Sequence, residues 1–222
     1  MSDSICENIL RINKEIETIS QEFSVPKLPK LIAVSKNQDV SKIEQAILCG
    51  QTDFAENYIQ EAEEKWLPLK NKYPHVCLHL IGNLQKNKVK KALHLFDCIH
   101  TLDSISLANR IAKLMEEDGL TNKTFLIQVL LDKNSSTKYG LPIEELPSLI
   151  NESNKLNLNI IGLMGVAPID SPATAFLNMQ NLAQENNLPE LSMGMSGDYE
   201  TAIKYGSTML RLGTAIFGKR ES

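Results

Sequence analysis

The sequence predicts an α/β protein, a single (β/α)8 TIM barrel that spans residues 1–222 and carries an extra N-terminal helix. Three observations lead to this prediction. The length of 222 residues fits one barrel domain, eight segments have the apolar pattern of short buried strands, and these segments alternate with helical ones. Strict alternation indicates parallel strands joined by crossover helices, and an eightfold repeat closes naturally into a barrel. The alternative is a doubly wound open sheet, which usually contains fewer units.

The extra helix is predicted over residues 3–22, before the first strand. Asp3 or Ser4 can cap its first turn, and Pro26 and Pro29 break the chain after it. Its apolar face consists of isoleucines at helical spacing. These are Ile5, Ile9, Ile12, Ile16 and Ile19.

The remaining elements are predicted in regular alternation along the chain. Gly50 and Gly206 follow two helices as C-terminal caps, and Pro142 precedes the first turn of another. A polar loop is expected over residues 134–140. The expected strands cover residues 31–36, 52–57, 76–82, 98–103, 124–131, 159–167, 191–195 and 208–214. The expected helices cover residues 40–48, 58–70, 85–94, 104–117, 143–151, 173–186 and 198–205.

Composition and charge exclude several classes of function. The net charge of −4 does not favour nucleic acid, and no apolar run is long enough to span a membrane. The N-terminus lacks an apolar signal core, so a cytoplasmic protein is expected. The cysteines have irregular spacing and no C-x-x-C pair, which suggests neither a zinc site nor a disulfide framework. Reduced thiols are therefore expected at Cys6, Cys49, Cys77 and Cys98.

The first strand is the starting point for a functional interpretation. Side chains alternate along a strand, so Ile32, Val34 and Lys36 share one face and the lysine follows two core residues. Burial lowers the pKa of a lysine, and a neutral amine can attack an aldehyde to form a Schiff base. Taken alone, this stretch favours a lysine that simply extends from the strand end into solvent. The other strand ends change that balance.

Polar and small residues follow the last two strands, where loops of such barrels often bind phosphate. Ser196 and Gly197 stand where a helix begins, and Gly213 and Thr214 add a second hydroxyl beside a small residue. Asp198 is unfavourable near a phosphate and is expected to cap that helix instead. For either loop alone, helix capping by Ser196 and a tight turn at Gly213 are an equal alternative. Both loops opposite a strand-end lysine favour a phosphorylated aldehyde cofactor. The other strand ends are Glu56-Asn57, Gly82-Asn83, Asp103, Asp132 and residues 164–167.

Several motifs, read in order from Leu31 to Arg220, resemble the pyridoxal 5′-phosphate homeostasis proteins of the YggS/PROSC type. They are Ala33-Val34-Ser35-Lys36, Glu56-Asn57-Tyr58, His79-Leu80-Ile81-Gly82, Leu84-Gln85, Asn87-Lys88, Gly162-Leu163-Met164, Leu191-Ser192-Met193-Gly194-Met195-Ser196 and Arg211-Leu212-Gly213-Thr214-Ala215-Ile216-Phe217-Gly218. The resemblance implies a barrel like the N-terminal domain of alanine racemase, with pyridoxal 5′-phosphate (PLP) bound to Lys36 as a Schiff base. It also implies a role for each of seven further residues. Ser196, Gly213 and Thr214 would bind the phosphate, Arg211 would face the pyridine nitrogen, Asn57 would lie near the ring, and His79 and Ile81 would help to wall the pocket.

The same residues favour a PLP carrier or regulator in intracellular vitamin B6 homeostasis over an enzyme. Arginine stays protonated, so Arg211 would disfavour a proton on the pyridine nitrogen and weaken the ring as an electron sink. Alanine racemase also uses a tyrosine from a second domain and a second subunit, whereas this chain ends at Ser222, soon after the last strand. No tyrosine is predicted at a strand end. A monomer is expected, with PLP and apo-PLP enzymes as partners.

Two alternative functions stay open at this point. The first is a PLP-dependent amino-acid racemase, and weak residual activity of that type is compatible with the carrier hypothesis. The second is a barrel that binds a phosphorylated metabolite without any cofactor. Lys86, Lys88, Lys90 and Lys91 are expected to form a solvated basic helix face, which could also attract a second phosphate or an acidic partner. No metal site is expected.

Overall fold

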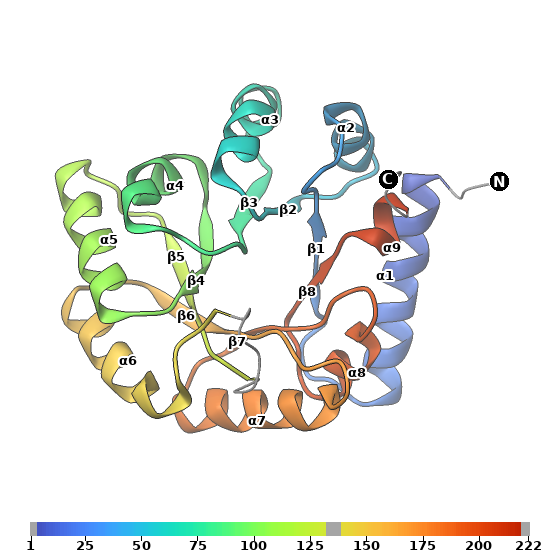
Figure 1. The fold of residues 1–222 in the computed structure, drawn as a ribbon. Coiled ribbons are helices and arrows are strands. Elements are labelled where there is room, and N and C mark those ends of the chain that lie inside the picture. Colours follow the sequence, from blue (N-terminus) through green and yellow to red (C-terminus); the bar gives the residue numbers. More distant parts are fainter. Residues whose placement is uncertain (1–3, 132–138, 219–222) are drawn as a thin grey trace.

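The computed structural model describes residues 4–131 and 139–218, and it confirms the predicted barrel. Eight parallel strands pair in sequence order, and β1 pairs with β8 to close the sheet. The helices form a ring outside the strands (Figure 1). The strands are β1 (Lys30–Val34), β2 (Asp53–Glu56), β3 (Cys77–Leu80), β4 (Cys98–Leu102), β5 (Thr124–Gln128), β6 (Ile160–Met164), β7 (Glu190–Ser192) and β8 (Met209–Leu212).

The helices follow the predicted alternation, with differences at their ends. They are α1 (Ile5–Glu22), α2 (Val40–Leu48), α3 (Ile59–Lys72), α4 (Val89–Leu95), α5 (Ile105–Glu117), α6 (Leu146–Lys155), α7 (Pro172–Glu185), α8 (Tyr199–Lys204) and α9 (Thr214–Phe217), with 3-10 turns η1 (Lys86–Lys88) and η2 (Ile143–Glu145) before α4 and α6. The predicted strands extend too far. Lys36 lies two residues beyond β1, and Thr214 begins α9 instead of ending β8. Asp3, Asp132 and most of the predicted loop 134–140 lie outside the described residues.

Helix α1 closes the helical ring where the first and last units of the barrel meet, and it packs there against α2, α8 and α9. Its predicted isoleucine stripe faces inward, with Ile9, Ile12 and Ile16 almost completely buried. Ser4 caps the helix: its Oγ accepts a hydrogen bond from the backbone N–H of Glu7, whose side chain accepts one from the Ser4 N–H. The extra N-terminal helix is thus part of the barrel wall.

The cysteines differ from the sequence prediction of four reduced thiols. Cys6 in α1 and Cys49 at the end of α2 form a disulfide, with their Cα atoms 5.4 Å apart. Tertiary packing of the two helices brings them together across 43 residues, which irregular spacing in the sequence does not reveal. Cys77 and Cys98 are free thiols on β3 and β4. Burial raises the pKa of Cys77 to about 11 and that of Cys98 to about 12, so both stay protonated at neutral pH.

The apolar core is divided by the sheet into two parts. The larger part lies between the strands and the surrounding helices and contains the largest buried side chains, such as Phe54 and Trp66. The smaller part fills the barrel interior with residues such as Ile32, Val34 and Leu126. Successive strand residues alternate between these two regions, as the pleat of a strand requires. The predicted inward direction of Ile32 and Val34 is therefore confirmed.

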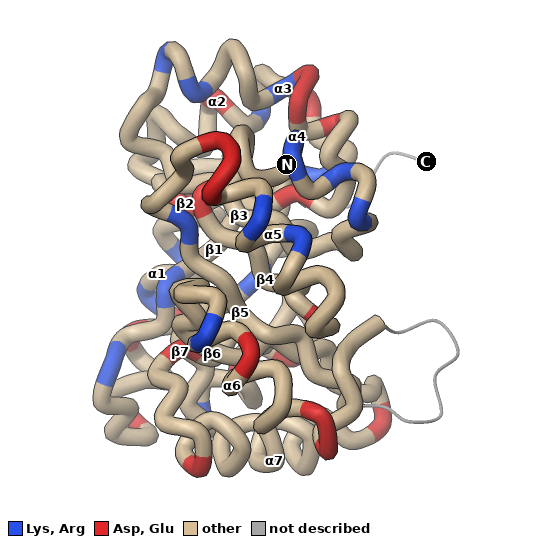
Figure 2. The backbone as a smooth tube through the Cα atoms, turned by 90° about the vertical axis from the view of Figure 1, so that its left-hand side faces the viewer, with Lys and Arg blue, Asp and Glu red and all other residues tan. Residues whose placement is uncertain are grey.

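Charged residues of both signs are interspersed over the surface (Figure 2). The predicted basic helix is divided between η1 and α4, and Lys86, Lys90 and Lys91 are exposed. Lys90 pairs with Asp118 at 3.0 Å and Lys91 with Glu63 at 2.8 Å, so part of this basic charge is neutralised locally. Among the described residues, no helix is both long and apolar enough to cross a membrane.

Candidate binding pocket

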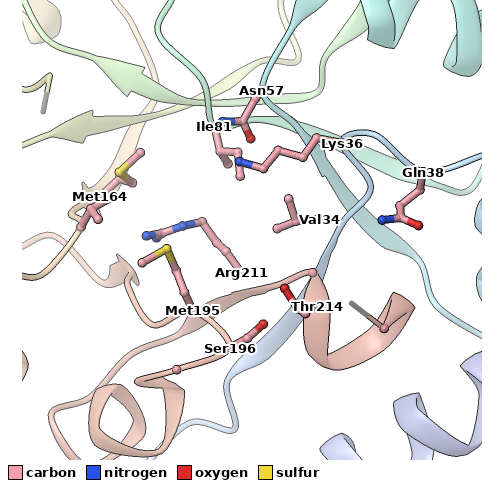
Figure 3. Close-up of a pocket in the computed structure, with 14 residues that line it drawn as sticks. Val34, Lys36, Gln38, Asn57, Ile81, Met164, Met195, Ser196, Arg211 and Thr214 are labelled. Atoms are coloured by element: carbon pink, nitrogen blue, oxygen red, sulfur yellow. The ribbon is translucent and has the colours of Figure 1, made fainter. Parts of the chain in front are cut away.

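A cavity of about 440 Å³ lies at the carboxyl ends of the strands, where the barrel class places its active sites. Side chains from β1, β6 and β8 converge on it, together with side chains from the segments that follow β1, β2, β3 and β7 (Figure 3). The strand register explains this convergence: Val34 pairs with Ala55, and Ala33 pairs with Leu212, so the segments after β1, β2 and β8 meet at one edge. Seven of the eight predicted site residues line the cavity. They are Lys36, Asn57, Ile81, Ser196, Arg211, Gly213 and Thr214.

Lys36 occupies a short segment that hydrogen bonds fix on both sides. The backbone N–H of Ser35 donates to the Ala55 carbonyl at 3.0 Å, which extends the sheet by one residue. The backbone N–H of Asn37 donates to Glu61 Oε1 at 2.5 Å, and Asn37 has a left-handed φ of 57° that turns the chain away. Between them, the half-buried Lys36 side chain extends into the cavity beside Asn57 and Ile81 (Figure 3). The lysine therefore reaches the predicted site from a loop.

A buried carboxylate supports this segment from below. Glu56 is completely buried, and its Oε1 accepts hydrogen bonds from Ser35 Oγ at 2.7 Å and Trp66 Nε1 at 3.0 Å. The same oxygen pairs with Lys65 Nζ at 2.7 Å, and Lys65 also donates to the Ser35 carbonyl at 2.8 Å. We call Ser35, Glu56, Lys65 and Trp66 the Glu56 cluster. It joins β2, helix α3 and the residue before Lys36. The sequence alone did not predict this cluster.

Asn57 follows Glu56 directly and faces the cavity from the end of β2 (Figure 3). Its Oδ1 atom is buried and has no hydrogen-bond partner among the described residues. The backbone of Asn57 packs against Gly82, where an added Cβ would lie only 1.9 Å from the Asn57 carbonyl oxygen. Gly82 therefore fixes Asn57 against β3 by leaving room for its backbone. The result is an acceptor oxygen at the edge of the pocket.

The loops after β7 and β8 form the opposite wall of the cavity. Ser196 and Thr214 present hydroxyl groups there (Figure 3), and the Ser196 Oγ accepts a hydrogen bond from the Ala215 N–H at 3.3 Å. Ser196 does not cap α8, so the capping alternative does not apply to it. Asp198 occupies the N-cap position, but its carboxylate accepts from the Met195 N–H at 2.6 Å instead of from a helix N–H. Gly213 precedes α9 and lies close to Val34.

Arg211 lies in the floor of the cavity and is buried. Its Nη1 donates to Ser192 Oγ at 2.7 Å, and its Nη2 donates to the Gly165 carbonyl at 2.8 Å. Burial lowers the pKa of the Arg211 guanidinium to about 10, opposed by the negative charge of Asp198, so the group stays protonated at neutral pH. Its two partners are neutral acceptors, which fix the plane of the guanidinium without removing its charge.

His79 is not among the residues that line the cavity, although it was expected to wall the pocket. It faces the barrel interior on the same side of β3 as Ile81 but lies two residues deeper, and it contacts Asp53 and His100 there. The sequence indicated the correct face of the strand but not the depth.

Two tyrosines that were not predicted at the strand ends also lie at the carboxyl face of the barrel. Tyr58 and Tyr139 line a neighbouring cavity of about 480 Å³.

Comparisons with known proteins show the family of this chain. The sequence matches the family described as "Alanine racemase, N-terminal domain" over residues 8–221. It is 40% identical to the Pyridoxal phosphate homeostasis protein of Synechocystis sp., over 89% of this chain and 94% of that protein. The protein of the same name from Homo sapiens is 33% identical, over 87% of this chain and 77% of its own length. This chain belongs to the pyridoxal phosphate homeostasis protein family.

Solved structures of this family have the same fold. PipY of Synechococcus elongatus, solved without PLP, is 33% identical with a TM-score of 0.87, and covers 97% of this chain and 100% of its own. The same protein with PLP bound is 32% identical with a TM-score of 0.84. An alanine racemase from Bacillus anthracis, 16% identical with a TM-score of 0.66, covers 95% of this chain with 57% of its own and shares the fold. The predicted likeness to the alanine racemase barrel is confirmed.

The Glu56 cluster leads to a prediction about stability. Glu56→Gln is expected to lower the free energy of unfolding by about 3 kcal/mol, because it removes the buried one of the two carboxylates that pair with the Lys65 ammonium. Urea unfolding followed by circular dichroism measures this change. Glu61→Gln is the matched control, since Glu61 also pairs with Lys65 but its side chain is 25% exposed, and a loss below about 1 kcal/mol is expected there. Equal losses in both variants would contradict the importance of the Glu56 cluster.

Proposed function

We propose that this protein binds PLP in the pocket, with the aldehyde held as a Schiff base by Lys36. One observation carries the proposal: a single cavity has the Lys36 amine on one wall, the hydroxyls of Ser196 and Thr214 on the opposite wall, and Arg211 between them (Figure 3). An amine and an anion-binding wall across one cavity suit a phosphorylated aldehyde. The names of the relatives and the PLP bound to PipY support the same cofactor.

The residues present fit PLP at each of its functional groups. Two hydroxyls and the backbone at Gly213 can donate hydrogen bonds to a phosphate. The protonated Arg211 can donate to the pyridine nitrogen, which is an acceptor when it carries no proton. The unpartnered Oδ1 of Asn57 can accept from a protonated oxygen or nitrogen on the ring. When bound, PLP would supply an aldehyde and an electron-withdrawing ring, and the chain would bind and orient it.

We further propose that the protein holds and releases PLP as a carrier or regulator and does not turn over amino acids. The side chains that line the pocket include Lys36 and Arg211 as titratable groups and no carboxylate that could pair with the pyridine nitrogen, within the residues that the structure describes. Tyr58 and Tyr139 belong to the lining of the neighbouring cavity. A weak electron sink and the lack of a second base at the pocket both disfavour racemisation.

The partners follow from this role. We propose a single-domain monomer that acts in the cytoplasm and passes PLP to apo-PLP enzymes. The neighbouring cavity shares Asn57 and Ile81 with the pocket, so the site has an open side at the carboxyl face of the barrel. A bound aldehyde would thus be accessible to an incoming amine.

Lys36→Ala is expected to abolish the visible absorbance band of bound PLP while the far-ultraviolet circular dichroism stays unchanged, because the residue lies in a loop and its side chain extends into the cavity. Borohydride reduction of the parent protein, followed by peptide mapping, should place the pyridoxyl group on Lys36. Lys88→Ala is the control, since Lys88 lies in the neighbouring cavity. A pyridoxyl group found mainly on Lys88 or another lysine would refute the assignment.

Ser196→Ala and Thr214→Val are each expected to weaken PLP binding about tenfold to a hundredfold without removing the band at saturating PLP. Each variant loses a hydroxyl hydrogen bond to a charged phosphate, worth about 1.5–3 kcal/mol. Fluorescence titration gives the dissociation constants. Pyridoxal, which has no phosphate, serves as the control ligand and should bind the parent and both variants alike. Equal affinity of the parent for pyridoxal and PLP would rule out a phosphate site at these loops.

The PLP-loaded protein is expected to exchange the α-hydrogen of alanine or serine at least about 10²-fold more slowly than an enzyme that has a base on each face of the substrate. Lys36 can act on one face only, and Arg211 keeps the ring a weak electron sink. NMR in deuterium oxide, with both enantiomers of each amino acid, follows the exchange. Rapid exchange with inversion of configuration would replace the carrier proposal with the racemase alternative.

A further inference from the structure

A row of polar side chains crosses the barrel interior beneath the pocket. Each member comes from a different strand: Asp53 from β2, His79 from β3, His100 from β4, Ser192 from β7 and Arg211 from β8. All five are buried. The distances are 3.1 Å from Asp53 Oδ1 to His79 Nε2, 2.9 Å from His79 Nδ1 to His100 Nε2, 2.9 Å from His100 Nδ1 to Ser192 Oγ, and 2.7 Å from Ser192 Oγ to Arg211 Nη1. We call these five residues the buried row.

If both imidazoles of the buried row are neutral, its two ends determine the direction of every hydrogen bond within it. A carboxylate can only accept, and a guanidinium can only donate. His79 must therefore donate from Nε2 to Asp53, which leaves its Nδ1 to accept from His100 Nε2. His100 Nδ1 then accepts from the Ser192 hydroxyl, whose oxygen accepts from Arg211. With both imidazoles neutral, every donor points toward Asp53, and every ring nitrogen of the row has a partner.

The charges at both ends are consistent with this direction. Burial alone would raise the pKa of the Asp53 carboxyl, but hydrogen bonds from His79 and Lys30 and the charge of Lys30 outweigh it and lower the pKa to about 2. Burial lowers the pKa of His100 well below its usual value, so this ring is neutral. Lys30 pairs with Asp53 at 3.0 Å, and its side chain is 49% exposed at the amino end of β1. The row thus runs from the pocket floor to the opposite mouth of the barrel.

We propose that the buried row is a positioning device for the cofactor: His79, His100 and Ser192 transmit the negative charge of Asp53 to Arg211 and fix the guanidinium plane under the pocket. The statement about the cofactor rests on the proposed function, whereas the row itself does not. Hydrogen bonds in a chain polarise one another, so the carboxylate makes Ser192 Oγ a better acceptor for Arg211. A guanidinium stabilised in this way keeps its proton and keeps the pyridine nitrogen of bound PLP unprotonated.

A metal site is the competing explanation of the same side chains. Asp53, Cys77 and His79 form one group of possible ligands, and His79, Cys98 and His100 form another, with ligand atoms within 4.8 Å of one another in each group. A metal ion would have to displace the protons of buried thiols whose pKa values burial has raised, and would break the bond between the two imidazoles. The hydrogen-bonded row gives Asp53, His79 and His100 partners as they stand, so it is favoured.

Nitrogen NMR of the histidine rings in the cofactor-free protein tests the row independently of PLP. At pH 8, long-range ¹H–¹⁵N spectra of protein labelled at histidine should show His79 and His100 both neutral and both protonated at Nε2. The exposed His75 and His94 complete the set of four histidines, and single substitutions assign the signals. A proton on Nδ1 of either buried ring would overturn the proposal. So would stoichiometric zinc in the purified protein whose removal shifts these signals.

Variants at the two ends of the row test its effect on the pocket. Ser192→Ala and Asp53→Asn should each weaken PLP binding about tenfold and change the pH dependence of the visible band, because Arg211 loses its acceptor or the charge behind it. Asp97→Asn is the matched control: Asp97 also pairs with a lysine, Lys70 at 2.6 Å, but does not belong to the row. Its affinity and band should match those of the parent. An unchanged affinity and band in both Ser192→Ala and Asp53→Asn would overturn the positioning role.

Substitutions of the middle residue separate positioning from folding. His100→Gln retains an acceptor and a donor in a planar group, whereas His100→Leu has neither, so the glutamine variant should keep more of the parent affinity for PLP. If both have equally low affinity while circular dichroism shows them folded, the positioning role is refuted. Should His100→Leu fail to fold, the ring signals of the parent still decide the direction of the row. Failure of the parent itself to bind PLP would refute the proposed function, and the ring tautomers would then still show whether the row exists.

Discussion

The pocket depends on one buried carboxylate. Glu56 accepts hydrogen bonds from the hydroxyl of Ser35 and the indole of Trp66 and pairs with Lys65, all through a single oxygen. These contacts hold the residue before Lys36 against the residue before Asn57, and they attach both to helix α3. The long side chain of a lysine carries about 2 kcal/mol of rotamer entropy. Mobility of the loop backbone would add to this freedom, so a fixed backbone is needed to place the amine. The ion pair is thus placed where it limits the positions that the Lys36 amine can adopt.

The fold and the polar strand ends of the pocket could be predicted because they depend on periodic features of the sequence, whereas the roles of Asn57, Ile81 and Arg211 were implied by the family resemblance. Alternating apolar strands and helices specify the barrel, and parallel strands bring all their carboxyl ends to one edge. Lys36, Ser196 and Thr214 were found in this way although they are far apart in the chain. The predicted strand ends were only approximate, since Lys36 lies in a loop and Thr214 begins a helix. Neither shift moved a side chain out of the pocket, because Lys36 and Thr214 lie directly after their strands, at the edge that the cavity occupies.

The errors concern depth and contacts between distant elements, which periodicity does not specify. His79 and Ile81 share one face of β3, yet only Ile81 reaches the cavity, because strand tilt decides which layer of the barrel interior a residue occupies. The Cys6–Cys49 disulfide depends on how α1 packs against α2. The Glu56 cluster and the buried row depend on side chains that meet across several strands. The sequence signal that could have indicated such a network is the presence of inward-facing polar residues on adjacent strands, such as His79 and His100.

If the pocket binds PLP as proposed, the two networks together would favour holding its aldehyde over transforming it. The Glu56 cluster restricts the segment before Lys36, on the wall that would hold the aldehyde, while the buried row contacts Arg211, on the floor that would face the ring. Arg211 donates to two neutral acceptors, the nearest carboxylate along the row is Asp53 at its far end, and Asp198 acts on the guanidinium by charge alone. A carboxylate in direct contact would neutralise the guanidinium charge locally, whereas a charge transmitted through His79, His100 and Ser192 would stabilise the proton and leave the positive potential at the pocket. That potential suits an unprotonated pyridine nitrogen and an anionic phosphate, and it opposes the protonated ring that carbanion chemistry would use.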